Sequence, residues 1–239
     1  MPRAIITGAS SGIGAAMARE FSRRGYALAL LARRAELLDQ LAGELPDTVA
    51  IPCDVTDSAA VHDAVKRAGP IDVAIANAGV GITGYASKII DEAEVMMRVN
   101  YFGMIYLFGA VVPAMIERGA GRFAGIASIA GLRGLPSASG YSASKAAMQA
   151  FLESARGELA PLGIRVTTVN PGFIATAMTE KNTFRMPFLM QADAAARIIV
   201  DGIERGARIV EFPRPMSMAM RFARLLPSAV YDRVMRNRR

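Results

Sequence analysis

A tyrosine and a lysine lie four positions apart in the stretch SGYSASKAAMQAF, which has the pattern of a helix that begins with small residues. Tyr141 and Lys145 therefore share one helical face. A free tyrosine has a pKa of about 10 and is a poor base at neutral pH, but a nearby ammonium favours the phenolate. Such a pair can exchange a proton with a carbonyl/alcohol couple. Because pairs at this spacing also occur by chance on many helices, the interpretation depends on further residues.

Ser128 adds a hydroxyl thirteen positions before the tyrosine, at the end of the apolar stretch RFAGIAS. Ligands of open α/β sheets lie at the carboxyl ends of the strands, so this hydroxyl is placed to polarise a substrate carbonyl. The alternative is that it only caps a turn.

The stretch TGASSGIG follows the first apolar run and opens the first helical pattern. Its glycines, Gly8, Gly12 and Gly14, let backbone N–H groups approach a pyrophosphate at a helix N-terminus. An ordinary tight turn is the alternative, but the position between strand and helix favours a nucleotide site.

The end of the second apolar run, LLARRAE, carries Arg33 and Arg34 where NAD sites usually place an acid. Guanidinium groups bind a 2′-phosphate through charge-assisted hydrogen bonds, whereas a carboxylate would repel it. We therefore predict NADP(H) as the cofactor in preference to NAD(H). The alternative is that both arginines are solvated at the start of the next helix.

The elements that must position these residues alternate between short apolar runs and helical patterns. Strands without a polar face, separated by helices, indicate a parallel sheet covered on both sides. The predicted fold is a single-domain, doubly wound α/β fold with about seven strands. The seven predicted strands are RAIITG, YALALLAR, VAIPCD, DVAIANAG, RFAGIAS, IRVTTVNPG and ARIVEFP.

The composition excludes several classes of site. The chain has 239 residues, of which one is cysteine and one is histidine, so neither a disulfide framework nor a metal cluster is expected. We expect no signal peptide, no membrane-spanning helix and a cytoplasmic location. The net charge is +7, but residues 214–239 hold seven arginines and one acid and so account for +6 of it. The rest is nearly neutral, and no nucleic-acid partner is expected.

The motifs together resemble those of a known family. TGASSGIG, ANAG, VN, Ser128, YSASK and NPG occur in the order found in short-chain dehydrogenases/reductases, over about residues 3–213. The resemblance implies a Rossmann-type fold and an NADP-preferring enzyme of this family. It implies that Tyr141 is the general acid/base and that Lys145 holds the nicotinamide ribose and lowers the tyrosine pKa. Ser128 would orient the substrate, and Asn100 would hold a water in a proton relay.

The resemblance also implies a set of cofactor contacts. Asp54 would lie near the adenine, and Ile174 and Thr176 near the nicotinamide carboxamide. Two departures from the family pattern are Ala76, where a second asparagine is usual, and the two serines of the glycine loop, where NADP-preferring members often carry a basic residue. The expected cofactor residues are Gly8, Ser10, Ser11, Gly12, Ile13, Gly14, Arg33, Arg34, Asp54, Val55, Asn77, Ala78, Gly79, Tyr141, Lys145, Pro171, Gly172, Ile174 and Thr176.

Three further expectations concern the rest of the chain. Residues 173–192 fall where this family places its substrate lid. Their many Met and Phe side chains predict a lipophilic carbonyl or alcohol as substrate. The alternative is that these side chains only pack the lid on the core. The resemblance implies a homodimer or homotetramer through the helices of residues 100–119 and 140–163. The basic tail, 214–239, reads as two amphipathic helices split at Pro227, which would lie on an anionic membrane, on the lid or on a partner subunit.

The function predicted from the sequence is an NADP(H)-dependent oxidoreductase that interconverts a carbonyl and an alcohol. The alternatives are an NAD(H)-dependent alcohol dehydrogenase of the same family and a non-catalytic nucleotide-sensing protein on the same fold.

Overall fold

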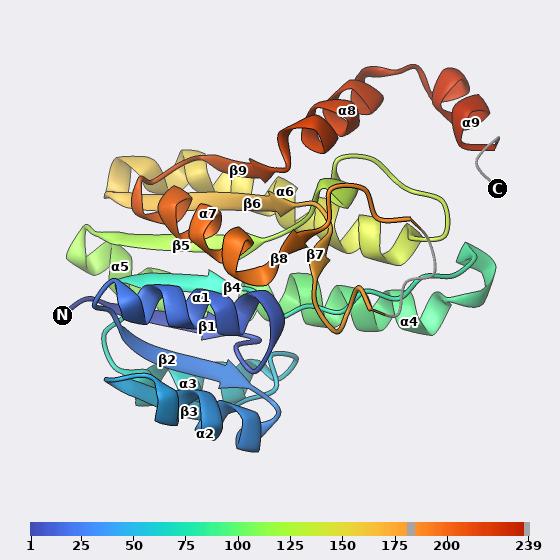
Figure 1. The fold of residues 1–239 in the computed structure, drawn as a ribbon. Helices are drawn as coiled ribbons and strands as arrows, with labels where there is room; N and C mark the ends of the chain where they lie inside the picture. Colours follow the sequence, from blue (N-terminus) through green and yellow to red (C-terminus); the bar gives the residue numbers. More distant parts are fainter. Residues whose placement is uncertain (181–184, 237–239) are drawn as a thin grey trace.

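A computed structural model of the chain describes residues 1–180 and 185–236 (Figure 1). Its main sheet has seven parallel strands in the order β3-β2-β1-β4-β5-β6-β9, which confirms the predicted fold class. These strands are β1 Arg3–Thr7, β2 Ala27–Ala32, β3 Thr48–Pro52, β4 Val73–Ala76, β5 Gly121–Ile126, β6 Ile164–Pro171 and β9 Ile209–Phe212. A second, small sheet pairs β7 Ile174–Ala175 with β8 Met190–Gln191.

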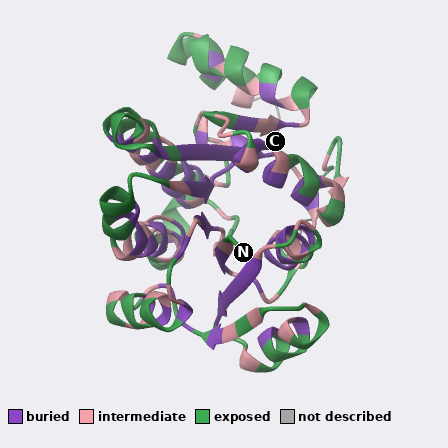
Figure 2. Ribbon diagram, turned by 90° about the vertical axis from the view of Figure 1, so that its left-hand side faces the viewer, coloured by how far each residue is buried: buried purple, intermediate pink, exposed green. Residues whose placement is uncertain are grey.

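Helices cover both faces of the main sheet. The α-helices are α1 Gly12–Arg23, α2 Ala35–Glu44, α3 Ser58–Ala68, α4 Ile90–Met96, α5 Gly103–Arg118, α6 Ser139–Leu159, α7 Ala192–Glu204, α8 Arg214–Leu225 and α9 Ser228–Arg236. Four shorter segments are η1 Ala86–Lys88, η2 Met97–Phe102, η3 Ile129–Gly131 and η4 Ala160–Leu162. The fold is thus three layers deep, as Figure 2 shows by the buried strands between more exposed helices.

Two apolar cores form because neighbouring residues of a strand point to opposite faces. On β1, Ala4 and Ile6 belong to the core beneath α1, α2 and α7, whereas Ile5 belongs to the core beneath α3, α5 and α6. Every residue of β2 is buried, as expected of a central strand covered on both sides. The order of the strands reverses at β1 and β4, and their carboxyl ends therefore border a crevice.

The segments α4, η2 and α5 form one helix, Ile90–Arg118, that is long and apolar enough by length and composition to cross a membrane. It packs against β4, β5, α3 and α6, so it serves as a core helix of the domain. Its outer side leaves Val95, Phe102 and Ile116 exposed. The η2 segment is π-helical, an irregularity that is frequent at functional sites and that the sequence pattern did not predict.

The tail forms two helices split at Pro227, as its sequence predicts, and it packs on the loop that follows η3. The Nη1 of Arg133 donates hydrogen bonds to the carbonyl oxygens of Ala223 (2.9 Å) and Leu226 (2.8 Å) at the end of α8. Its guanidinium lies 4.2 Å from the ring centroid of Tyr231, whose hydroxyl donates to the Gly134 carbonyl at 2.6 Å. These contacts fix α8 and α9 beside the cavity described below.

An ion cluster joins α1 to α7. The carboxylate of Glu20 accepts hydrogen bonds from Arg23 and Arg24, and Arg24 also pairs with Asp201 and Glu204. The hydrogen bond from Arg23, helped by Arg24 against the cost of burial, lowers the pKa of Glu20 from 4.5 to about 2. Since this folded-state pKa is depressed, the stabilisation is present above pH 4.5 and is lost as the pH falls towards 2.

We therefore expect Glu20→Gln to lower the free energy of unfolding at pH 7 by about 2 kcal/mol. The free energies of unfolding of the wild type and of Glu20→Gln should become equal as the pH falls below the folded-state pKa of Glu20. Denaturant unfolding at several pH values measures this difference. The matched control is Glu44→Gln, which removes an exposed pair with Arg19 and should cost less than about 1 kcal/mol. An equal loss in both variants at pH 7 would contradict the assignment.

Candidate active site

A cavity of about 1910 Å³ opens along the carboxyl ends of β1, β4, β5 and β6. Nearly all the predicted site residues line it: Gly8, Ser10, Ser11, Gly12, Ile13, Arg33, Arg34, Asp54, Val55, Asn77, Ala78, Gly79, Ser128, Tyr141, Lys145, Pro171, Gly172, Ile174 and Thr176. The other two, Gly14 and Asn100, lie behind this lining. The structure thus brings together residues that are far apart in the sequence.

The glycine loop needs its small residues for a close approach between two loops. Gly8 has a φ of +67°, and a Cβ added there would lie 2.7 Å from the Cα of Ala78. A Cβ on Gly14 would collide with the Gly8 carbonyl oxygen, so only glycine lets the start of α1 pack this closely against the loop. The side chain of Asn77 holds the same loop, because its Nδ2 donates to the carbonyl oxygens of Thr7 (2.9 Å) and Gly8 (3.2 Å).

The first turn of α1 faces the cavity without a local side-chain partner. Its N-cap residue, Ser11, makes no capping hydrogen bond from its side chain, and the turn contains no acid. The N–H groups and the positive end of the helix dipole are therefore available to an anion in the cavity. This arrangement fits the pyrophosphate of a dinucleotide.

The side chain of Arg34 lies over the glycine loop, where its Nη2 donates to the hydroxyls of Ser10 (2.9 Å) and Ser11 (2.7 Å). The guanidinium thereby occupies the neighbourhood in which the family often has a basic residue within the loop. Arg33 is exposed at the rim of the same part of the cavity. The pKa of Asp54 is lowered by hydrogen bonds from the backbone and side chain of Thr56, with a smaller contribution from Arg33. Asp54 is thus anionic and fixed in a turn.

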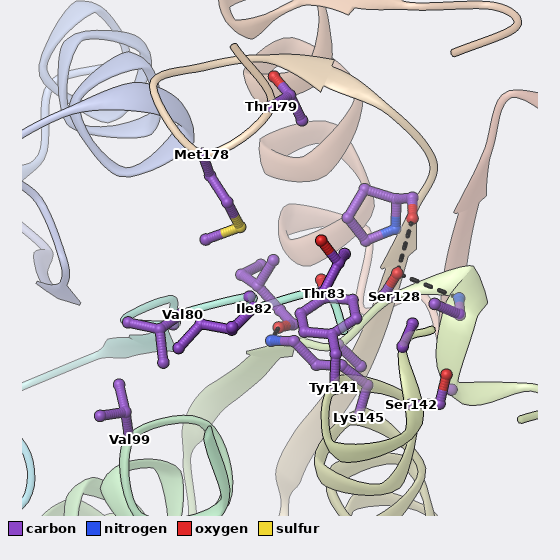
Figure 3. Close-up of a pocket in the computed structure, with 18 of the residues that line it drawn as sticks. Val80, Ile82, Thr83, Val99, Ser128, Tyr141, Ser142, Lys145, Met178 and Thr179 are labelled. Atoms are coloured by element: carbon purple, nitrogen blue, oxygen red, sulfur yellow. Dashed lines mark hydrogen bonds between the residues drawn. The ribbon is translucent and has the colours of Figure 1, made fainter. Parts of the chain in front are cut away.

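Ser128, Tyr141 and Lys145 converge at the other end of the cavity, as Figure 3 shows. Tyr141 and Lys145 come from the first turns of α6, and Ser128 follows β5. The Ser128 hydroxyl accepts a hydrogen bond from the Ala130 N–H at 3.1 Å and donates to the Pro171 carbonyl at 3.5 Å. It therefore caps a turn and also lines the cavity, so the cap does not prevent the predicted contact with a substrate, which stays a prediction.

Lys145 is only 4% exposed, and its Nζ donates to the Ile126 carbonyl at 2.7 Å. The same nitrogen lies 5.7 Å from the centroid of the Tyr141 ring. Burial lowers the pKa of Lys145 to about 7. Burial raises the pKa of Tyr141, while a hydrogen bond with Ser128 lowers it. The net effect on the phenol is a raised pKa, because burial outweighs the hydrogen bond with Ser128, and the lowering by Lys145 stays a prediction.

Asn100 is buried in the π-helical segment, where it joins two other parts of the site. Its Oδ1 accepts from the Val80 N–H at 2.8 Å, and its Nδ2 donates to the Val80 carbonyl and to the Ser144 hydroxyl. A Cβ on Gly79 would lie 3.2 Å from this Oδ1 and 3.5 Å from the Nζ of Lys145. Asn100 therefore positions the loop after β4 against α6, close to the lysine.

Gln149 is a site residue that the sequence analysis missed. Its Nε2 donates to the Ser128 carbonyl at 2.7 Å and to the Oδ1 of Asn170 at 2.9 Å. Tyr141, Lys145 and Gln149 follow one another at intervals of four residues, so the helical spacing was the available signal. The glutamine positions the backbone of Ser128 and does not line the cavity.

The apolar residues of the predicted lid lie in different surroundings, and their role as a lid stays a prediction. Phe173 and Met178 line the cavity, whereas Phe188 and Leu189 are exposed and Met190 packs against the core. Phe184, also expected in the lid, lies outside the described residues. The tail supplies the rest of the apolar wall, through Met216, Met220, Tyr231 and Met235, a contribution that the sequence pattern left open.

The family model for short chain dehydrogenases matches residues 2–186 of this chain. The chain belongs to the short-chain dehydrogenase/reductase family. It is therefore an oxidoreductase of the class that acts on CH–OH and C=O groups.

Individual relatives of the chain are consistent with this assignment. An uncharacterized oxidoreductase of Myxococcus xanthus is 36% identical over 245 residues, which cover 99% of this chain and 97% of the relative. A solved short-chain dehydrogenase from Sphingobium yanoikuyae in complex with NADPH is 30% identical, with a TM-score of 0.82, and the match covers 100% of this chain and 94% of that one. A 3-ketoacyl-(acyl-carrier-protein) reductase from Brucella melitensis complexed with NADH is 26% identical, with a TM-score of 0.82. The match covers 88% of this chain and 96% of that one.

Proposed function

We propose that this protein is an NADP(H)-dependent oxidoreductase that interconverts a carbonyl and an alcohol, with Tyr141 as the general acid/base. The observation that carries the proposal is the meeting of Ser128, Tyr141 and Lys145 in the same cavity as the glycine loop. When bound, the nicotinamide dinucleotide would supply or accept the hydride at the carbonyl carbon. The uncapped start of α1 suits its pyrophosphate.

The preference for NADP(H) rests on the arginines. Arg34 is held over the glycine loop by Ser10 and Ser11, and Arg33 lies beside it at the rim, so two guanidiniums are available to a 2′-phosphate. The solved relatives hold either NADPH or NADH, and they therefore do not discriminate between the two cofactors. NAD(H) remains the alternative cofactor within the same proposed reaction.

The proton chemistry follows from the protonation states of the site. The raised pKa of Tyr141 keeps its hydroxyl protonated at neutral pH, and it is therefore ready to donate to a carbonyl oxygen during reduction. The Ser128 hydroxyl would hold the same oxygen. In the reverse direction the phenol must first lose its proton, so alcohol oxidation should become faster as the pH rises. Lys145 would hold the ribose and pass protons from the side of Asn100.

We further propose a lipophilic substrate, since Met178, Met216, Met220 and Met235 line the cavity with flexible apolar side chains. Along a series of aliphatic ketones and aldehydes, kcat/KM should rise by about tenfold for each two or three added methylenes until the cavity is filled. Steady-state assays with NADPH measure this trend.

Two variants of α8 sharpen the test of the apolar wall. Met220→Ser should reduce the gain with chain length, whereas Met218→Ser should not, because Met218 lies on the same helix but outside the cavity lining. Faster turnover of small charged ketones than of long apolar ones would contradict the proposed substrate class.

We propose a homodimer or homotetramer formed through α5 and α6, supported by the exposed side chains of Ile116 on α5, of Phe102 in η2 just before α5 and of Leu162 in η4 just after α6. Light scattering coupled to size-exclusion chromatography should give a mass of two or four chains. A monomer at micromolar concentration would contradict it.

A further inference from the structure

Helix α8 is apolar on two opposite sides. Met216 and Met220 face the cavity, whereas Met218, Phe222 and Leu225 are 70%, 66% and 82% exposed. Residues 218, 222 and 225 recur at helical spacing and so share one side, and the offset of two positions from Met216 places that side opposite the cavity. We call Met218, Phe222 and Leu225 the outer face of α8. The inner side is accounted for by the cavity, but among the described residues, 1–180 and 185–236, no apolar side chain covers the outer face.

The outer face is bordered by positive charge. Arg214, Arg221 and Arg224 are all exposed on α8, and this helix contains no acidic residue. Arg221 pairs with Glu211 of β9, which holds it near the base of the helix. On α9, Val230, Arg233 and Val234 are exposed as well.

The arm formed by α8 and α9 stands out from the body of the domain, beyond β9 (Figure 1), and its surface is largely exposed (Figure 2). It is nevertheless anchored, because Arg133 binds the carbonyl groups at the end of α8 and Tyr231 binds Gly134. The outer face is therefore presented on a fixed helix.

We propose that the outer face of α8 docks on an anionic lipid bilayer. Large apolar side chains flanked by arginines are the chemistry of a helix that lies in the membrane interface, with the apolar side in the acyl region and the guanidiniums at the headgroup phosphates. A second copy of the chain is a poorer partner. A two-fold contact would bring the arginines of two α8 helices together with no acid on either helix to pair with them.

The test is co-sedimentation of the full chain with vesicles, whose readout does not depend on any enzymatic activity. Vesicles of phosphatidylglycerol and phosphatidylcholine should bind the protein at least about tenfold more tightly than phosphatidylcholine alone, and raised salt should weaken this binding. The double variant Phe222→Ser/Leu225→Ser should bind the anionic vesicles at least about tenfold more weakly. Its melting temperature should stay unchanged, because both side chains are exposed.

The matched control is Ile90→Ser, which removes an equally exposed apolar side chain (70%) from α4 and should leave vesicle binding unchanged. The proposal fails if the protein does not bind anionic vesicles, or if the double variant binds them as well as the wild type. It also fails if light scattering shows that the double variant has lost a subunit contact while vesicle binding is unaffected, because the outer face would then be a protein interface.

Discussion

Replacing Tyr141 with phenylalanine should lower kcat/KM for carbonyl reduction by about a thousandfold, the usual contribution of a positioned general acid. The change removes only the hydroxyl, so the ring can keep its place beside Gly81 and Met178. Binding of NADPH should change little, since the glycine loop and the arginines are untouched. The loss should therefore appear in kcat, as expected when a group acts in the transition state.

The pH profile distinguishes a lost proton donor from a disturbed fold. With the wild type, alcohol oxidation should rise with pH through the neutral and alkaline range, because burial raises the pKa of the phenol. That dependence should disappear in Tyr141→Phe. The control Tyr106→Phe removes a hydroxyl from α5 outside the cavity lining and should keep both rate and profile. A Tyr141→Phe enzyme with the wild-type pH dependence would show that another group moves the proton.

The second large effect concerns the choice of cofactor. The double variant Arg33→Ala/Arg34→Ala should lower the ratio of kcat/KM for NADPH to that for NADH by about a hundredfold, through the loss of charge-assisted hydrogen bonds to the 2′-phosphate. Arg34→Ala alone should also lower kcat/KM for NADH, because the change removes the hydrogen bonds that hold Ser10 and Ser11 of the glycine loop. Arg33→Ala alone should lower the ratio of kcat/KM for NADPH to that for NADH and should leave kcat/KM for NADH unchanged.

Steady-state assays with both cofactors give these ratios. Arg98→Ala, which removes an exposed arginine paired with Glu94, serves as the charge-matched control for each single variant and should leave the ratio unchanged. A wild-type preference for NADH, or an unchanged ratio in the double variant, would end the assignment of NADP(H).

Most of the fold could be predicted because its signals are local. All seven strands of the main sheet were found from apolar runs such as that of β2, whose six residues are all buried. The two tail helices were divided correctly at Pro227, since proline is unfavourable within a helix and is tolerated at its start. The π-helical turn around Asn100 was missed, because it arises from tertiary contacts with Val80 and Ser144 and leaves no periodic pattern.

The site was predictable where function depends on a motif and less so where it depends on packing. The glycine loop, Ser128, Tyr141 and Lys145 were found because their order and spacing resemble a family. Gln149 was missed although it continues the four-residue spacing of Tyr141 and Lys145, because its contacts with Ser128 and Asn170 depend on the tertiary structure. The raised pKa of the Tyr141 phenol was not predicted, because burial cannot be read from a spacing of four residues.

The central claim is that Tyr141 moves the proton in an NADPH-linked carbonyl reduction. The most direct measurement is the decrease in NADPH absorbance with a panel of carbonyls of different size and polarity, recorded for the wild type and Tyr141→Phe side by side. The account predicts that apolar carbonyls are reduced by the wild type and that this activity is almost absent from the variant. Equal activity of the two proteins on the same substrate would contradict it.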